Sequence, residues 1–114
     1  MNFANYLSQQ PLDEQHEVSI HDIARATVER RQGSLILHFI QSEQKGGGSK
    51  MLIKICETAD ELNLPIMLHV HPIKHYARIA GIVPLSKHDL KSWYGRYGFE
   101  GEFDSMIRQP KGNM

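Results

Sequence analysis

The chain has 114 residues and a formal net charge of zero, with histidine counted as neutral. This length is typical of one domain, and the charge balance argues against broad nucleic-acid binding, which favours a basic excess. A single cysteine excludes an intrachain disulfide, and no apolar run reaches the roughly 18 residues of a membrane-spanning helix, so we expect a cytoplasmic protein with no membrane partner.

Residues 1–16 are mostly polar and predict an N-terminal tail, with at most one short helical turn near Asn5. Residues 17–31 are ambiguous, because their apolar residues fit either a strand or a helix. Within them we favour a strand over residues 26–30. Gly33 then supplies the positive φ of a hairpin turn, so this strand should pair with the next one.

Residues 34–41 are almost continuously apolar and predict a central strand that is covered on both faces. After three glycines, residues 50–63 carry apolar side chains three and four positions apart. This spacing predicts an amphipathic helix, with Ser49 as its N-cap. Residues 66–70 predict a second strand. Because a helix links the two strands, they should be parallel neighbours.

Residues 72–84 have mixed character and predict no clear element. Residues 86–96 predict a helix that ends before Gly98. Residues 99–103 then predict a turn or short strand, and residues 105–109 predict the last strand.

The expected fold class is therefore α/β (α+β), with a mixed central β-sheet flanked by helices. Residues 17–110 would form one domain, and residues 111–114 a C-terminal tail. Cys56, Trp93 and Phe99 are expected to pack in the core rather than to form a site.

The glycine triplet Gly46-Gly47-Gly48 is the first candidate for a binding site. N–H groups at the start of a helix have no partner within the helix, and the helix dipole adds partial positive charge there. Glycine also lets a ligand approach the backbone closely. A strand, a glycine turn and a helix therefore predict a phosphate site, with a simple flexible turn as the alternative.

This turn and its surroundings resemble the GNAT-type N-acetyltransferases. Residues 43–52 are similar to the Arg/Gln-x-x-Gly-x-Gly/Ala signature of that family, with Gly46 and Gly48 at its glycines. Residues 59–72 resemble the stretch in which a helix end leads through a strand to a proline.

Two later stretches continue the resemblance, which covers residues 34–110 in all. Residues 90–99 are similar to the aromatic-Tyr-x-x-x-Gly-Phe element, with Tyr94 at the tyrosine. Residues 106–110 resemble the final strand of small phage- and plasmid-type members.

The resemblance implies the GNAT-like acyl-CoA N-acyltransferase fold and the transfer of an acetyl group from acetyl-CoA to an amine of an unknown acceptor. Acetyl-CoA would lie in a splayed gap between the strands at residues 34–41 and 66–70. Tyr94 would protonate the departing thiolate, and His38 or His69 would be the base for the amine. Backbone of His38, Phe39 and Ile40 would hold the pantetheine. The residues implied to hold the pyrophosphate are Lys45, Gly46, Gly47, Gly48, Ser49 and Lys50.

Two departures from the family pattern leave an alternative open. Glu43 stands where the family has Arg or Gln, and a carboxylate beside a pyrophosphate is unfavourable unless it points away. The part before Gly33 is also too short for the strand and two helices that usually build the acceptor site. The alternative is a non-catalytic, phage-type interaction or regulatory protein on the same fold. Either the acceptor site is open or a second subunit completes it. The short front end and the exposed strand edges predict a homodimer.

The histidines suggest a third hypothesis. His69 and His71 would project from the same face of a strand, and with His75 nearby they could share a metal ion. This would make the chain a metal-dependent hydrolase or a metal-binding module. The plainer interpretation is that one histidine lines the cleft while the other is packed or at the surface.

Overall fold

The structure is a computed structural model that describes residues 3–44, 46–70, 75–77, 87–102 and 104–111. Among these residues, none of the helices is long and apolar enough to cross a membrane. The described ranges hold three helices and six strands in the order α1 (Phe3–Ser8), β1 (Gln15–Ile20), β2 (Ala24–Arg31), β3 (Ser34–Ser42), α2 (Gly47–Leu62), β4 (Ile66–His69), β5 (His75–Ala77), α3 (Lys87–Gly95) and β6 (Ser105–Arg108).

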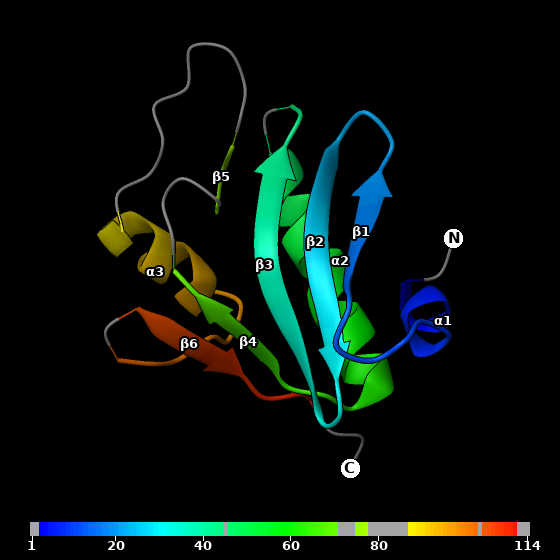
Figure 1. The fold of residues 1–114 in the computed structure, drawn as a ribbon. Helices are drawn as coiled ribbons and strands as arrows, with labels where there is room; N and C mark the ends of the chain where they lie inside the picture. Colours follow the sequence, from blue (N-terminus) through cyan, green and yellow to red (C-terminus); the bar gives the residue numbers. More distant parts are fainter. Residues whose placement is uncertain (1–2, 45, 71–74, 78–86, 103, 112–114) are drawn as a thin grey trace.

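The first three strands form an antiparallel meander (Figure 1). Gly33 closes the turn between β2 and β3 with a φ of 86°, which confirms the predicted hairpin. The ambiguous segment of residues 17–31 holds two strands rather than one, because β1 precedes β2 and pairs with it from Gln15 to Ile20.

The β3–α2–β4 unit has the predicted parallel arrangement, with Leu35, Ile36 and Leu37 opposite Ile66, Met67 and Leu68. Strand β6 completes the sheet antiparallel to β4, so the order is β1-β2-β3-β4-β6. Strand β5 pairs with the second half of β3. The mixed α+β sheet is therefore as predicted.

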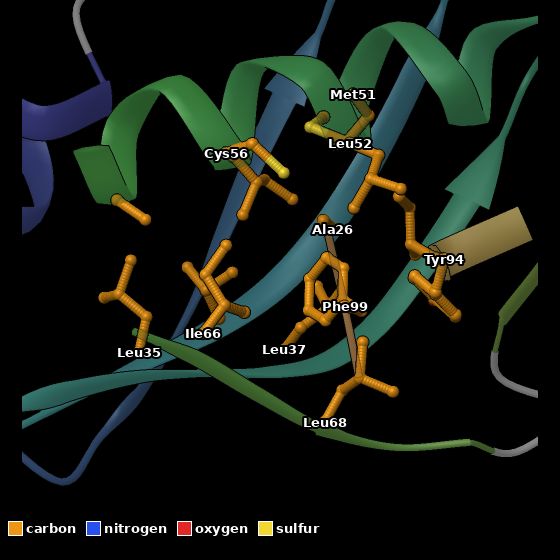
Figure 2. Close-up of a cluster of buried hydrophobic side chains, with 14 of the residues drawn as sticks. Ala26, Leu35, Leu37, Met51, Leu52, Cys56, Ile66, Leu68, Tyr94 and Phe99 are labelled. Carbon is orange, nitrogen blue, oxygen red and sulfur yellow. The ribbon is translucent and has the colours of Figure 1, made fainter. Parts of the chain in front are cut away.

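The core lies between the sheet and α2, and α3 adds Tyr94 to the same side (Figure 2). Apolar residues of α2 at the predicted spacing are buried there, and Asn63 ends the helix in the left-handed conformation. No helix among the described residues lies on the opposite face of the sheet, where Ile36 and Phe39 are half-buried and Met67 is exposed. The prediction that β3 is covered on both faces is therefore wrong for the described part of the chain.

The N-terminal residues do not form the predicted tail. Residues 3–8 form helix α1, which confirms the short helical turn near Asn5, but this helix packs on α2 and buries Phe3 and Leu7. The sequence hides this helix because six residues are too few to display a helical period.

One buried ion pair joins α2 to the last strand. Arg108 is almost fully buried, and its Nη1 and Nη2 atoms lie 2.9 and 3.1 Å from the two carboxylate oxygens of Asp60. The backbone N–H of Lys111 donates to the same carboxylate. The Arg108 guanidinium and then this N–H hold the pKa of Asp60 below its ordinary value.

We expect Asp60→Asn to lower the free energy of unfolding by about 1–3 kcal/mol at neutral pH, because it leaves the buried Arg108 guanidinium without its counter-charge. A lowered folded-state pKa gives stability that is present at neutral pH and is lost as the pH falls through that lowered pKa. Urea unfolding at several pH values should therefore show the two proteins converging in acid.

Asp104→Asn is the matched control, since Asp104 makes an exposed pair with Lys87 at 3.1 Å. It should cost less than about 1 kcal/mol. Equal losses in the two variants would contradict a special contribution from the buried pair.

Candidate functional site

The glycine turn places α2 directly after β3. The helix begins at Gly47, and Gly46 precedes it as the N-cap in the left-handed conformation, with a φ of 79°. Ser49 is therefore in the first helical turn, and its prediction as the N-cap is wrong. The N-cap is Gly46, because glycine adopts the left-handed conformation needed there without strain. Lys45 lies outside the described residues.

The glycines of this turn have different reasons to be glycine. Gly46 needs its positive φ, whereas Gly47 is buried, and a Cβ there would overlap the carbonyl oxygen of Ile23 and lie 2.7 Å from Ser42 Oγ. A Cβ at Gly48 would make only ordinary contacts, 3.7 Å from the Trp93 ring. Packing therefore does not explain the glycine at position 48, and a ligand that approaches the backbone there would explain it.

Trp93 orients the first turn of α2 from α3. Its indole Nε1–H donates to Ser49 Oγ at 3.2 Å, and its ring lies against the position of Gly48. Because Ser49 Oγ accepts this hydrogen bond, its own hydroxyl hydrogen is available to point elsewhere. Trp93 was expected only in the core, and its partner is too distant in sequence for the contact to be predicted.

Glu43, the departure from the family signature, faces a cation in the structure. Its Oε1 lies 3.7 Å from Arg25 Nε, and the Arg25 guanidinium also donates to Gln41 Oε1. The charge of Glu43 is thus balanced by the Arg25 guanidinium of β2. Glu43 therefore no longer argues strongly against an anion at the glycine turn.

Strand β3 has an irregular point at His38 and Phe39. On its β2 side, Thr27 is opposite Phe39 while Val28 is opposite Leu37, so His38 is the extra residue of a bulge. On the other side, the described ladder with β4 stops at Leu37, and the ladder with β5 starts at Ile40. Strands β3 and β4 diverge beyond this point (Figure 1). Ile40 was expected to contact pantetheine, but it is buried and paired with His75. The backbone that could hold pantetheine is therefore limited to His38 and Phe39.

His38 belongs to a polar network that sequence reasoning missed. Its Nε2 lies 2.7 Å from Glu29 Oε1, and Arg31 Nε donates to Glu29 Oε2 at 2.6 Å. Glu29 is 6% exposed although it is an acid on the outer face of β2. The Arg31 guanidinium, and after it His38, holds the pKa of Glu29 below its ordinary value, so the carboxylate is ionised.

Tyr94 is fully buried in the core on the helix side of the sheet. Its ring packs edge-on against Phe99 at 5.3 Å and lies 4.9 Å from Trp93 between ring centroids. Burial raises the pKa of the phenol well above its ordinary value, so Tyr94 is neutral. It is thus on the opposite face of β3 from the Glu29–His38 pair.

The metal hypothesis finds no support in the described residues. No three side chains of His, Cys, Asp and Glu come together there in a way that could hold a metal ion. His69 is exposed at the end of β4, while His71 and the side chain of His75 lie outside the described residues.

Cys56 is buried, as predicted, at the edge of a cavity of about 470 Å³ between α2 and the turn after α3. Burial raises the pKa of its thiol to about 11, so the thiolate needed for a nucleophile is scarce at neutral pH.

Comparison with known proteins gives one structural similarity. No protein-family model and no curated protein sequence matches the chain. The fold is similar to that in the crystal structure of the anti-CRISPR protein AcrVA5, with a TM-score of 0.63 and 19% sequence identity. The match covers 82% of this chain and 96% of that chain. At this identity, the similarity concerns the fold alone.

We expect Gly47→Ala and Gly48→Ala to differ sharply in stability. Gly47→Ala should lower the free energy of unfolding by about 1–3 kcal/mol, because its Cβ overlaps backbone that cannot move easily. Gly48→Ala should be neutral or stabilising by up to about 1 kcal/mol, since alanine favours a helix and has room there. Urea unfolding compares them, and equal effects would contradict the different packing of the two glycines.

Proposed function

We propose that this chain is an N-acetyltransferase that moves an acetyl group from acetyl-CoA to an amine. The observation that carries this proposal is the glycine turn: Gly48 is glycine without a packing reason, at the start of a helix that follows the strand with the interrupted ladder. The start of such a helix is suited to bind phosphate, because its N–H groups and the helix dipole favour negative charge.

The residues of the turn suit the pyrophosphate of CoA. The backbone of Gly48 and Ser49 belongs to the first turn of α2, Lys50 is exposed beside it, and the Ser49 hydroxyl can donate a further hydrogen bond. The pairing of Glu43 with Arg25 removes the main electrostatic objection. Lys45 and Gly46 remain predicted contacts.

The interruption of the β3 ladder suits the acyl end. In the described residues, His38 and Phe39 lie between the β4 and β5 ladders, so their backbone is the part of this edge suited to hold pantetheine and to polarise a thioester carbonyl. Tyr94 packs on the helix face of β3, and the side chain of His38 projects from the other face of this strand. Because burial favours the neutral phenol, Tyr94 is better suited to stabilise the departing sulfur by a hydrogen bond than to give up its proton fully.

Calorimetric titration with acetyl-CoA tests the proposal. The wild-type protein should bind it, and Gly48→Ala should weaken binding about tenfold, or roughly 1.4 kcal/mol, because the added methyl group keeps the phosphate from the backbone. Gly95→Ala is the matched control: it also adds a methyl group, has open space around it and lies at the far end of α3.

Gly95→Ala should bind acetyl-CoA like the wild type. A wild-type protein that gives no binding heat at millimolar acetyl-CoA would overturn the proposal. Equal weakening in the two variants would show that the effect does not arise at the glycine turn.

Tyr94→Phe tests the role of the phenol. The variant keeps the ring that packs on Phe99 and loses only the hydroxyl, so turnover should fall about tenfold while affinity for acetyl-CoA stays within about twofold. Release of CoA thiol measures turnover. An unchanged rate would remove Tyr94 from the mechanism.

A second function is favoured by the structural similarity. The neighbour is described as an anti-CRISPR protein, and the match extends over 96% of that chain. We propose as the alternative that this chain is a non-catalytic, phage-type regulator that binds another protein. The sheet face on which the described residues place no helix offers a surface for it. Failure of the acetyl-CoA titration would favour this alternative. In both proposals, a homodimer and a cytoplasmic location remain predictions.

A further inference from the structure

The cavity between α2 and the turn after α3 lies away from the glycine turn. Its volume of about 470 Å³ is within the range of small-molecule sites. Along α2 its wall runs from Ile53 to Asp60, which are roughly 8 and 18 Å further along the helix axis than Gly48. The cavity is therefore a different place from the turn proposed for acetyl-CoA.

Arg108 gives this cavity a preorganised hydrogen-bond donor. The residue is 4% exposed and lines the cavity. In the described structure its Nε donates to the carbonyl oxygen of Tyr97, and Nη1 and Nη2 each donate to one carboxylate oxygen of Asp60. A guanidinium has five N–H groups, so these three bonds fix its plane and leave one N–H on each terminal nitrogen for a ligand.

The charges around the cavity favour an anion. Arg96 and Lys111 line it with exposed side chains that form no ion pair within the described ranges. The acids of the described walls are Asp60 and Glu57, and Asp60 is already neutralised by Arg108. Two cations therefore remain against the single carboxylate of Glu57, so a ligand with one negative charge is attracted.

The same cavity also offers apolar surface. Ile53 lines it while 46% exposed, and Cys56 and the half-buried Tyr97 line it as well. Packing carbon atoms against such residues is favourable because it removes apolar surface from water. A ligand with an apolar body therefore gains more here than a bare ion of the same charge.

We propose that this cavity is a binding site for a small carboxylate with an apolar body. Its carboxylate lies near Arg96, Lys111 and Arg108, and its body packs on Ile53 and Tyr97. A carboxylate matches the excess of one positive charge, and the volume matches a small molecule rather than a chain segment. The site is additional to the glycine turn and does not rest on the acetyltransferase proposal.

Benzoate is the probe, titrated into ¹⁵N-labelled wild-type protein at constant ionic strength. The amide signals of Gly95 and Gly98, which both line the cavity, should shift and saturate, while that of Gly33 in the β2–β3 turn should not. Benzamide has nearly the same shape without the charge, and acetate has the charge without the ring. Each should bind at least about fivefold more weakly than benzoate.

Three exposed side chains give variants of opposite sign. Arg96→Gln and Lys111→Gln should each weaken benzoate binding about two- to fivefold, whereas Glu57→Gln should tighten it by a similar factor, because it removes the opposing charge. All three residues are exposed, so the variants should fold like the wild type. A general structural effect would change the affinity in one direction only.

Glu61→Gln is the matched control for Glu57→Gln. It removes the same charge from an exposed position of the same helix that does not line the cavity. The affinity for benzoate should therefore change less than in Glu57→Gln. Equal tightening in the two variants would show that only the overall charge of the protein matters, and would overturn the site.

Three further results would overturn the inference. The first is the absence of any shift at Gly95 and Gly98 at about 20 mM benzoate, where even a weak site is filled. The second is equal binding of benzoate and benzamide, which would remove the anion from the argument. The third is a set of shifts confined to Gly48 and its neighbours, which would place the anion at the glycine turn. A failed acetyl-CoA titration would overturn the proposed function and leave this site intact.

Discussion

Strand β3 is the constraint on which the rest of the structure depends. One edge pairs with β2 along its length, while the other edge is shared by β4 and then by β5. Because two strands share that edge, its ladder is interrupted at His38 and Phe39, and the β2 side carries its bulge at the same place. The irregular backbone and the Glu29–His38 pair therefore lie at the same place, where β4 gives way to β5 along the edge of β3.

The start of α2 depends on how β3 ends. The backbone N–H of Glu43 donates to the carbonyl oxygen of Ile23 at 2.8 Å, and Gly47 packs directly on that same carbonyl. The turn before β2 thus holds the exit from β3 and the entry to α2 together. Trp93 adds a second restraint from α3 through Ser49. A phosphate site needs this kind of preformed backbone, since ordering it only on binding would cost affinity.

The elements that could be predicted are those whose pattern is local. The apolar run of residues 34–41 and the helical spacing of residues 50–63 depend on their own side chains, so the βαβ unit followed from the sequence. Helix α1 did not follow, because its stability comes from packing on α2 rather than from its six residues. The glycine turn before a helix was also predictable from the sequence, and its role as a site stays a prediction.

The partners within the site could not be predicted, because they depend on register. Glu29 and His38 come together from different strands, and His38 is the extra residue of a bulge whose position the sequence does not report. Trp93 and Ser49 are 44 positions apart. Nothing in a single sequence reports such pairings, and Glu29 looks like any other charged residue of a strand.

The side chains proposed for the transfer lie on both faces of β3. Tyr94 lies in the core on the helix face of β3, and His38 lies on the face that the described helices leave uncovered, so a transfer that used both would pass through the plane of the sheet. In a continuous ladder, backbone hydrogen bonds close that passage. The described ladders leave His38 and Phe39 between them, at the place where β3 and β4 diverge. In the proposed transfer, an acyl group held from the helix side would therefore meet the acceptor at these two residues.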